Sequence, residues 1–62
     1  MTFNEQIAKA VKDGKLAHDR AVIYLMNTPE RDEVDRVMEL PMDARFAAMK
    51  AVQTAKLESL LA

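Results

Sequence analysis

Apolar residues recur at intervals of three and four along most of this chain, which is the spacing of one face of an α-helix. Helix-ending and helix-starting signals at Gly14, Thr28-Pro29 and Pro41 divide the pattern into four segments. No glycine or proline follows Pro41, so the last segment predicts the longest helix, of about 20 residues. We therefore predict an all-α protein: a compact bundle of three to four short helices, the last one longest, in a single helical domain over residues 1–62.

The first segment has local signals for both ends of a helix. Thr2 and Glu5 have the spacing of a capping box, in which each side chain accepts a hydrogen bond from the other residue's backbone amide. Gly14 readily adopts the left-handed conformation that commonly ends a helix. These signals predict a helix over residues 3–13.

The second segment, residues 17–27, contains an apolar block at 21–26 that is also compatible with a buried strand. We favour a helix, because no other strand is available to pair with the backbone groups of a lone strand. A helix that is apolar nearly all round is covered by several neighbours. We therefore predict that this helix is the central one.

The third segment begins with a recognisable helix start. Thr28 is predicted as the N-cap, Pro29 as the first helical residue, and Glu30 as an acid favoured by the helix dipole. The helix should stop near Leu40, because Pro41 disfavours the helical conformation in the residue before it.

The last helix has two distinct faces. One face forms an apolar stripe that we predict to lie in the core and that is interrupted mainly by Gln53: Met42, Phe46, Met49, Leu57 and Leu60. The opposite side gathers small residues: Ala44, Ala47, Ala48, Ala51 and Ala55. These alanines reflect either helix propensity alone or a flat seam for a second helix. The second helix is either the one predicted over residues 3–13 of the same chain or the equivalent helix of a second chain. We predict the latter, a homodimer in which the last helix crosses its symmetry mate.

Four internal methionines, Met26, Met38, Met42 and Met49, fit two interpretations. They fill gaps in an ordinary core, or they form an adaptable binding surface, which flexible thioethers suit. Met38 and Met42 flank the Leu40-Pro41 bend, so we expect these two to be partly exposed.

The residue types that chemistry requires are sparse. His18 and Ser59 are the single histidine and the single serine, and neither has the neighbours of a nucleophile and base pair. His18 is expected to be solvated or to cap a helix. Gly14 is the only glycine, so no phosphate-binding loop is possible, and metal-binding motifs are absent. We predict no enzyme activity, no catalytic residues, no cofactor and no metal.

The chain has no cysteine, which favours a reducing, cytoplasmic setting. Its N-terminal residues lack the pattern of a signal peptide, and the longest apolar run, residues 21–26, is too short to cross a bilayer. We therefore expect a soluble protein with no membrane partner.

Charge is uneven although nine basic and ten acidic residues nearly balance overall. Residues 29–43 contain two basic and six acidic residues, whereas residues 44–62 contain three basic and one acidic. The acidic segment is either a solvated face or a surface that engages a basic patch on a partner or mimics the negative charge of nucleic acid. Its candidate partner-binding residues are Glu30, Asp32, Glu33, Asp35, Arg36, Glu39, Met38 and Met42.

A helix-turn-helix nucleic-acid-binding regulator is the rival from another class, because short helices joined by tight turns suit that motif. The charge pattern opposes it. The third helix would enter the groove, and its acidic residues would face phosphates at a large electrostatic cost.

Residues 11–16, Val-Lys-Asp-Gly-Lys-Leu, followed by Arg20, resemble a helix, Asp-Gly-Lys turn, helix unit in the C-terminal scaffold-like part of Mu-like phage head protease proteins. The resemblance covers residues 7–25, and the catalytic region of those proteases has no counterpart here. It implies a small phage-encoded protein with an assembly or protein-binding role. We predict a non-catalytic protein–protein interaction module, a phage or bacterial accessory protein that regulates or inhibits a host protein by binding its surface, with an assembly scaffold as the alternative.

Overall fold

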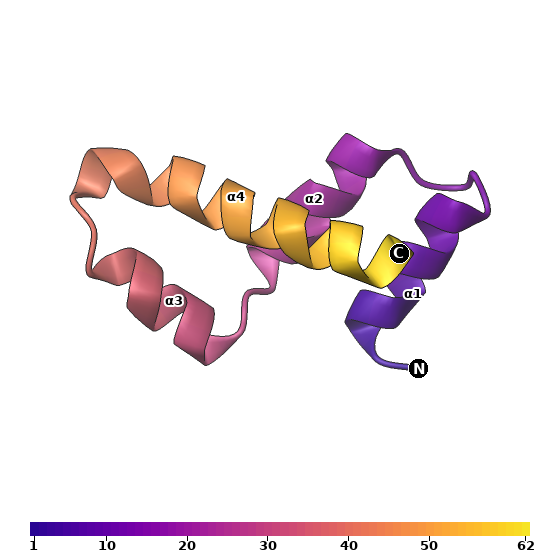
Figure 1. Ribbon diagram of the computed structural model, residues 1–62, viewed down its shortest axis with the longest axis horizontal. Helices are drawn as coiled ribbons and strands as arrows, with labels where there is room; N and C mark the ends of the chain where they lie inside the picture. The colour runs from indigo at the N-terminus through magenta and orange to yellow at the C-terminus, as the bar shows by residue number, and fades with distance from the viewer.

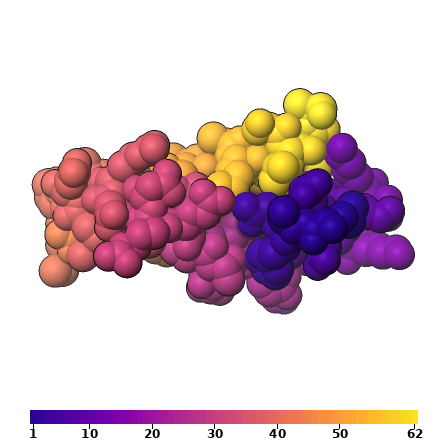
Figure 2. Space-filling view, turned by 90° about the horizontal axis from the view of Figure 1, so that it is seen from below, coloured from indigo at the N-terminus to yellow at the C-terminus, as the bar shows by residue number.

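Four α-helices form the computed structural model, which describes residues 1–62 (Figure 1). They are α1 (Phe3–Lys12), α2 (His18–Asn27), α3 (Arg31–Met38) and α4 (Met42–Leu61). The prediction of an all-α fold with the last helix longest is confirmed. The molecule is elongated, with extents of 37 × 20 × 19 Å, and Figure 2 shows α1 and α3 on different halves of it. None of the four helices combines the length and the apolarity that a membrane span requires.

Helix α4 is the organising element of the fold. It packs against each of the other three helices, α1 also packs against α2, and α3 contacts no helix except α4 (Figure 1). The prediction that residues 17–27 form the central helix is wrong, because Ile23 and Tyr24 of α2 remain 52% and 42% exposed. Only α4, with its 20 residues, is long enough to contact all the others.

The predicted ends of α1 are confirmed by hydrogen bonds. The Glu5 amide donates to Thr2 Oγ1 at 3.2 Å, and the Thr2 amide donates to Glu5 Oε1 at 3.1 Å. Gly14 has a φ of +73°, and the Gly14 and Lys15 amides donate to the Val11 and Ala10 carbonyls at 3.1 and 2.9 Å. This is the Schellman arrangement that satisfies the last carbonyls of a helix.

The predicted start of the third helix is wrong. Thr28 ends α2, and its hydroxyl donates to the Tyr24 carbonyl at 3.1 Å instead of capping α3. The N-cap of α3 is Glu30, whose amide donates to Glu33 Oε1 at 3.0 Å. Pro29 therefore lies outside the helix. The Glu33 carboxylate binds the Glu30 amide, so the N-cap is Glu30, two residues after the predicted N-cap Thr28.

The core is small and lies where α1, α2 and the second half of α4 meet. Its buried residues are Ala8, Ala21, Val22, Leu25 and Leu57. Half-buried apolar side chains surround them: Ile7, Val11, Leu16, Met26, Leu60 and Leu61. Leu16 follows the Gly14 turn directly and packs against the core, so the turn positions an apolar side chain there.

The predicted core stripe of α4 is buried in its second half only. Leu57 and Gln53 have no exposed surface, whereas Met42 and Phe46 are 80% and 71% exposed, so their assignment to the core is wrong. Met49 and Leu60 are intermediate. The cause is length: the 10 residues of α2 span about 15 Å, while the 20 residues of α4 span about 30 Å. The stripe continues along α4 beyond the point where α2 can cover it.

Candidate protein-binding surface

A groove lies between α2 and α4, beside the uncovered part of the α4 stripe. Its volume is about 460 Å³. We call it the α2–α4 groove, and it is lined by His18, Asp19, Val22, Ile23, Met26, Phe46, Lys50 and Thr54. The apolar lining comes mainly from α2, and Phe46 adds an aromatic ring from α4.

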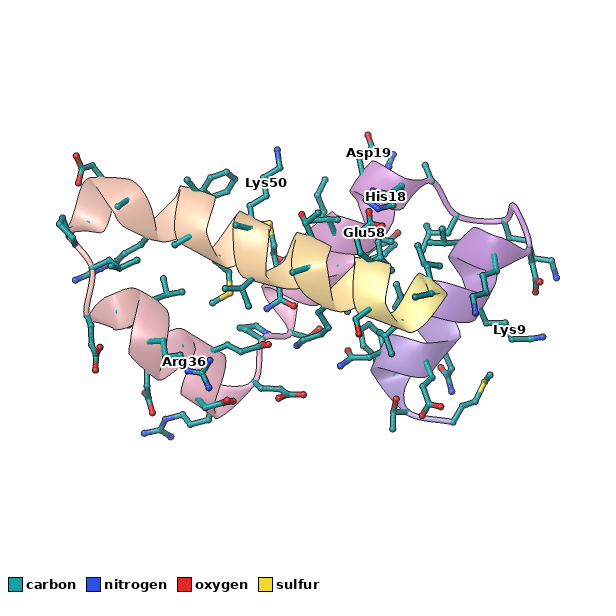
Figure 3. All side chains as sticks on the ribbon, in the orientation of Figure 1. Lys9, His18, Asp19, Arg36, Lys50 and Glu58 are labelled. Atoms are coloured by element: carbon teal, nitrogen blue, oxygen red, sulfur yellow. The ribbon has the colours of Figure 1, made fainter.

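Opposite charges stand on the two walls of the α2–α4 groove. Asp19 belongs to α2 and Lys50 to α4, both are exposed, and neither forms an ion pair within the chain. Figure 3 shows both side chains pointing to the same side of the molecule, away from its body. The groove thus has an apolar lining with an acidic and a basic rim.

His18 closes one end of the groove. Its Nε2 lies 2.8 Å from Oε1 of Glu58, so the pair joins the start of α2 to the end of α4 (Figure 3). The expectation of a solvated residue is met, since the His18 side chain is 45% exposed. The expectation of a capping role is not met, because Ala17 occupies the N-cap position of α2.

Two of the predicted acidic residues on α3, Asp32 and Asp35, form ion pairs with arginines of the same helix. Arg36 Nη2 lies 3.3 Å from Asp32 Oδ2, and Arg31 Nε lies 3.5 Å from Asp35 Oδ1. The two residues of each pair are one helical turn apart. Glu39 is exposed and forms no ion pair. The local excess of negative charge available to a partner is therefore smaller than the composition of residues 29–43 indicates.

Glu33 is not on the exposed face where the sequence placed it. It is 8% exposed, and Lys56 of α4 places its Nζ 2.7 Å from Glu33 Oε2. Gln53 Nε2 also donates to Glu33 Oε1, at 3.0 Å. Burial by itself raises the pKa of Glu33, but the hydrogen bonds from Lys56, Gln53 and the Glu30 amide outweigh burial and hold the pKa below its usual value. Glu33 therefore serves the fold and leaves no free carboxylate for a partner.

Sequence reasoning missed Lys56 and Gln53 as the partners of Glu33. One signal was available, because Gln53 interrupts an apolar stripe and a buried amide needs a polar partner. Lys56 lies 23 positions from Glu33, so no local spacing indicates the pairing. Lys56 Nζ also lies 4.0 Å from Oε1 of Glu30, whose side chain is exposed.

The turn between α3 and α4 exposes a second group of apolar side chains. Met38 is 55% exposed and Leu40 39%, next to the highly exposed Met42. The expectation that Met38 and Met42 are exposed is confirmed. Arg45 holds this turn, because its guanidinium donates to the Leu40 and Met38 carbonyls at 3.0 and 3.2 Å.

The alanine side of α4 faces away from the rest of the chain. Ala47, Ala51 and Ala55 are exposed, and Ala44 and Ala48 are intermediate. No other helix of the chain covers the exposed three, so a second chain has access to them. The alanine seam stays a prediction.

The second groove of the molecule is smaller than the α2–α4 groove. A groove of about 280 Å³ lies between α1 and the end of α4, lined by Met1, Glu5, Ala8, Lys9, Lys12 and Leu60. No three His, Cys, Asp or Glu side chains are grouped as a metal site would require. Comparisons of the chain with protein-family models, curated proteins and solved structures give no match.

Proposed function

We propose that this protein is a small, non-catalytic protein–protein interaction module whose binding surface is the uncovered part of the α4 stripe and the adjoining wall of α2. We call this surface the apolar strip and define it as Ile23 and Met26 of α2 with Met42 and Phe46 of α4. The observation that supports the proposal best is the exposure of Phe46, an aromatic residue that lines a groove yet is 71% exposed.

The composition of the strip suits a protein partner. Aromatic residues and methionine are enriched at protein interfaces, and flexible methionines adapt to the shape of a partner. Met42 and Phe46 lie one turn apart on the same side of α4, so they present one continuous surface. Large exposed apolar patches rimmed by polar residues mark interaction sites more often than scattered single residues do.

The size of the fold also supports a partner. Six apolar residues are buried, fewer than the nine large apolar residues that are exposed. A domain of this size buries only about 60% of the surface of its unfolded chain. Covering the apolar strip with another protein would add to the buried apolar surface that stabilises the chain.

The biological role that we propose is that of an accessory protein, phage or bacterial, which regulates or inhibits another protein by occupying its surface. The alternative role is an assembly scaffold, in which the same strip joins chains or holds an assembly partner. Both roles need a protein partner and neither needs catalysis.

A photo-crosslinking amino acid placed at position 46 tests the proposal, with the same amino acid at exposed Lys15, in the turn before α2, as control. In cell lysate we expect position 46 to yield defined covalent adducts with protein, including adducts with a second copy, and Lys15 to yield none. Equal crosslinking from both positions would contradict the proposal. Tight binding of labelled duplex DNA at low salt, weakened steeply by added salt, would favour a nucleic-acid-binding regulator instead.

A further inference from the structure

We propose that the α2–α4 groove binds the same groove of a second copy of this chain, in a dimer with two-fold symmetry. The inference rests on the proposed function, because it names the first partner of the apolar strip. It differs from a dimer through the alanine seam, which would use another side of α4.

Charge complementarity identifies the partner. A surface with an acidic group on one rim and a basic group on the other complements itself, because a two-fold rotation exchanges the two rims. Asp19 and Lys50 are such a pair: they stand on opposite walls of the groove, point to the same side (Figure 3), and have no ion-pair partner within the chain. A partner of one charge would satisfy only one of these rims.

The symmetry also fixes the contact. A two-fold axis that lies in the contact plane and passes between Asp19 and Lys50 places Asp19 of each copy opposite Lys50 of the other. Each ion pair therefore occurs twice. The apolar linings between the two rims meet in the same contact, so Ile23 and Phe46 lose much of their exposure.

The remaining polar groups of the groove leave this pairing free. His18 Nε2 lies 2.8 Å from Glu58 Oε1, and the Thr54 hydroxyl donates to the Lys50 carbonyl at 2.7 Å. Neither interaction uses the Asp19 carboxylate or the Lys50 ammonium group. The Asp19 carboxylate accepts a hydrogen bond only from the Arg20 amide, at 3.1 Å.

Two single charge reversals, Asp19→Lys and Lys50→Asp, test the dimer by sedimentation equilibrium. Either variant alone sets like charges against each other twice, so we expect its dimer dissociation constant to rise about tenfold or more over that of the parent chain. Lys15→Asp is the matched control, since it reverses an exposed lysine outside the groove and should leave the constant unchanged. Circular dichroism verifies that each variant remains helical.

Mixing the two variants gives the decisive measurement. In a heterodimer of Asp19→Lys with Lys50→Asp, both cross-chain pairs become attractive again, so the mixture should dimerise although each variant alone does so weakly. The chain with both reversals should likewise recover its dimer. A dimer through any other surface has no reason to show either recovery.

Two results would overturn the inference. One is a parent chain that stays monomeric at all accessible concentrations. The proposed function would survive that result if position 46 still crosslinks to another protein, and would fail with it if position 46 yields no adduct. The other is a dimer that is insensitive to both reversals. If Ala51→Glu then dissociates it, the contact is the alanine seam.

Discussion

Lys56 on α4 places its Nζ 2.7 Å from Oε2 of Glu33 on α3, and this ion pair joins the two helices across 23 positions of sequence. Gln53 donates to the same carboxylate, and the Glu30 amide does so as well. Glu33 thus fixes the start of α3 and its attachment to α4 at once. Since α3 contacts no other helix, much of its position depends on this carboxylate.

Replacing Glu33 by glutamine should lower the free energy of unfolding by about 1–3 kcal/mol, because the substitution leaves Lys56 without its closest partner in a largely buried place. Urea unfolding followed by circular dichroism measures the change. Asp35→Asn is the control: it removes an exposed pair with Arg31 and should change stability by less than about 0.5 kcal/mol. Equal effects of the two substitutions would show that the Glu33–Lys56 pair stabilises the fold no more than the exposed Arg31–Asp35 pair does.

Acid should destabilise the parent chain more than the Glu33→Gln variant. The pKa of Glu33 in the folded protein lies below the reference value of 4.5, so the unfolded state binds the proton more readily. The stabilisation is fully present above that reference value and is lost as the pH falls through the lowered pKa. Urea midpoints of the two proteins should therefore converge on acidification. Glu5, whose pKa is also lowered, by hydrogen bonds from Thr2, is common to both proteins and cancels in the comparison.

Two stripe residues of α4 should respond oppositely to truncation. Leu57→Ala removes a side chain without exposed surface and should cost about 2–5 kcal/mol, enough to unfold much of a chain this small. Phe46→Ser should leave the free energy of unfolding of the monomer nearly unchanged, because Phe46 is 71% exposed, yet abolish dimerisation. Thermal unfolding at high dilution separates the two effects. A large loss of monomer stability in Phe46→Ser would place this ring in the core after all.

Gly14→Ala should destabilise the protein by about 1 kcal/mol through the backbone alone. The φ of +73° is strained for any residue with a Cβ atom, while an added Cβ would meet no atom within 4 Å. Gly14→Asn should cost less, since asparagine tolerates the left-handed conformation better. If alanine and asparagine cost the same, the left-handed conformation is not what glycine supplies here. Thermal unfolding midpoints of the three proteins decide the order.

The sequence was most informative where the cause is local. Thr2 and Glu5 act over three positions and Gly14 over one turn, so their roles in α1 were readable before the structure. The exposure of Met42 was readable from its place beside the Leu40-Pro41 bend. The exposure of Phe46 was not readable, because it depends on how far α2 reaches along α4. The burial of Glu33 was not readable either, since its partner Lys56 lies in another helix. The predicted surface on α3 consequently shrank, and the apolar strip emerged from a stripe that had been assigned to the core.

The single attachment of α3 to α4 has a dynamic consequence. A helix that touches one neighbour can detach without disrupting the core formed by α1, α2 and the end of α4. Such opening is a sub-global unfolding event, which hydrogen exchange detects as amides that exchange faster than those of the core. We expect α3 amides to exchange well before those of α2. Detachment would expose the side of α4 next to Met42 and Phe46. A partner that binds α4 with higher affinity when α3 is detached would therefore shift the equilibrium toward the detached state.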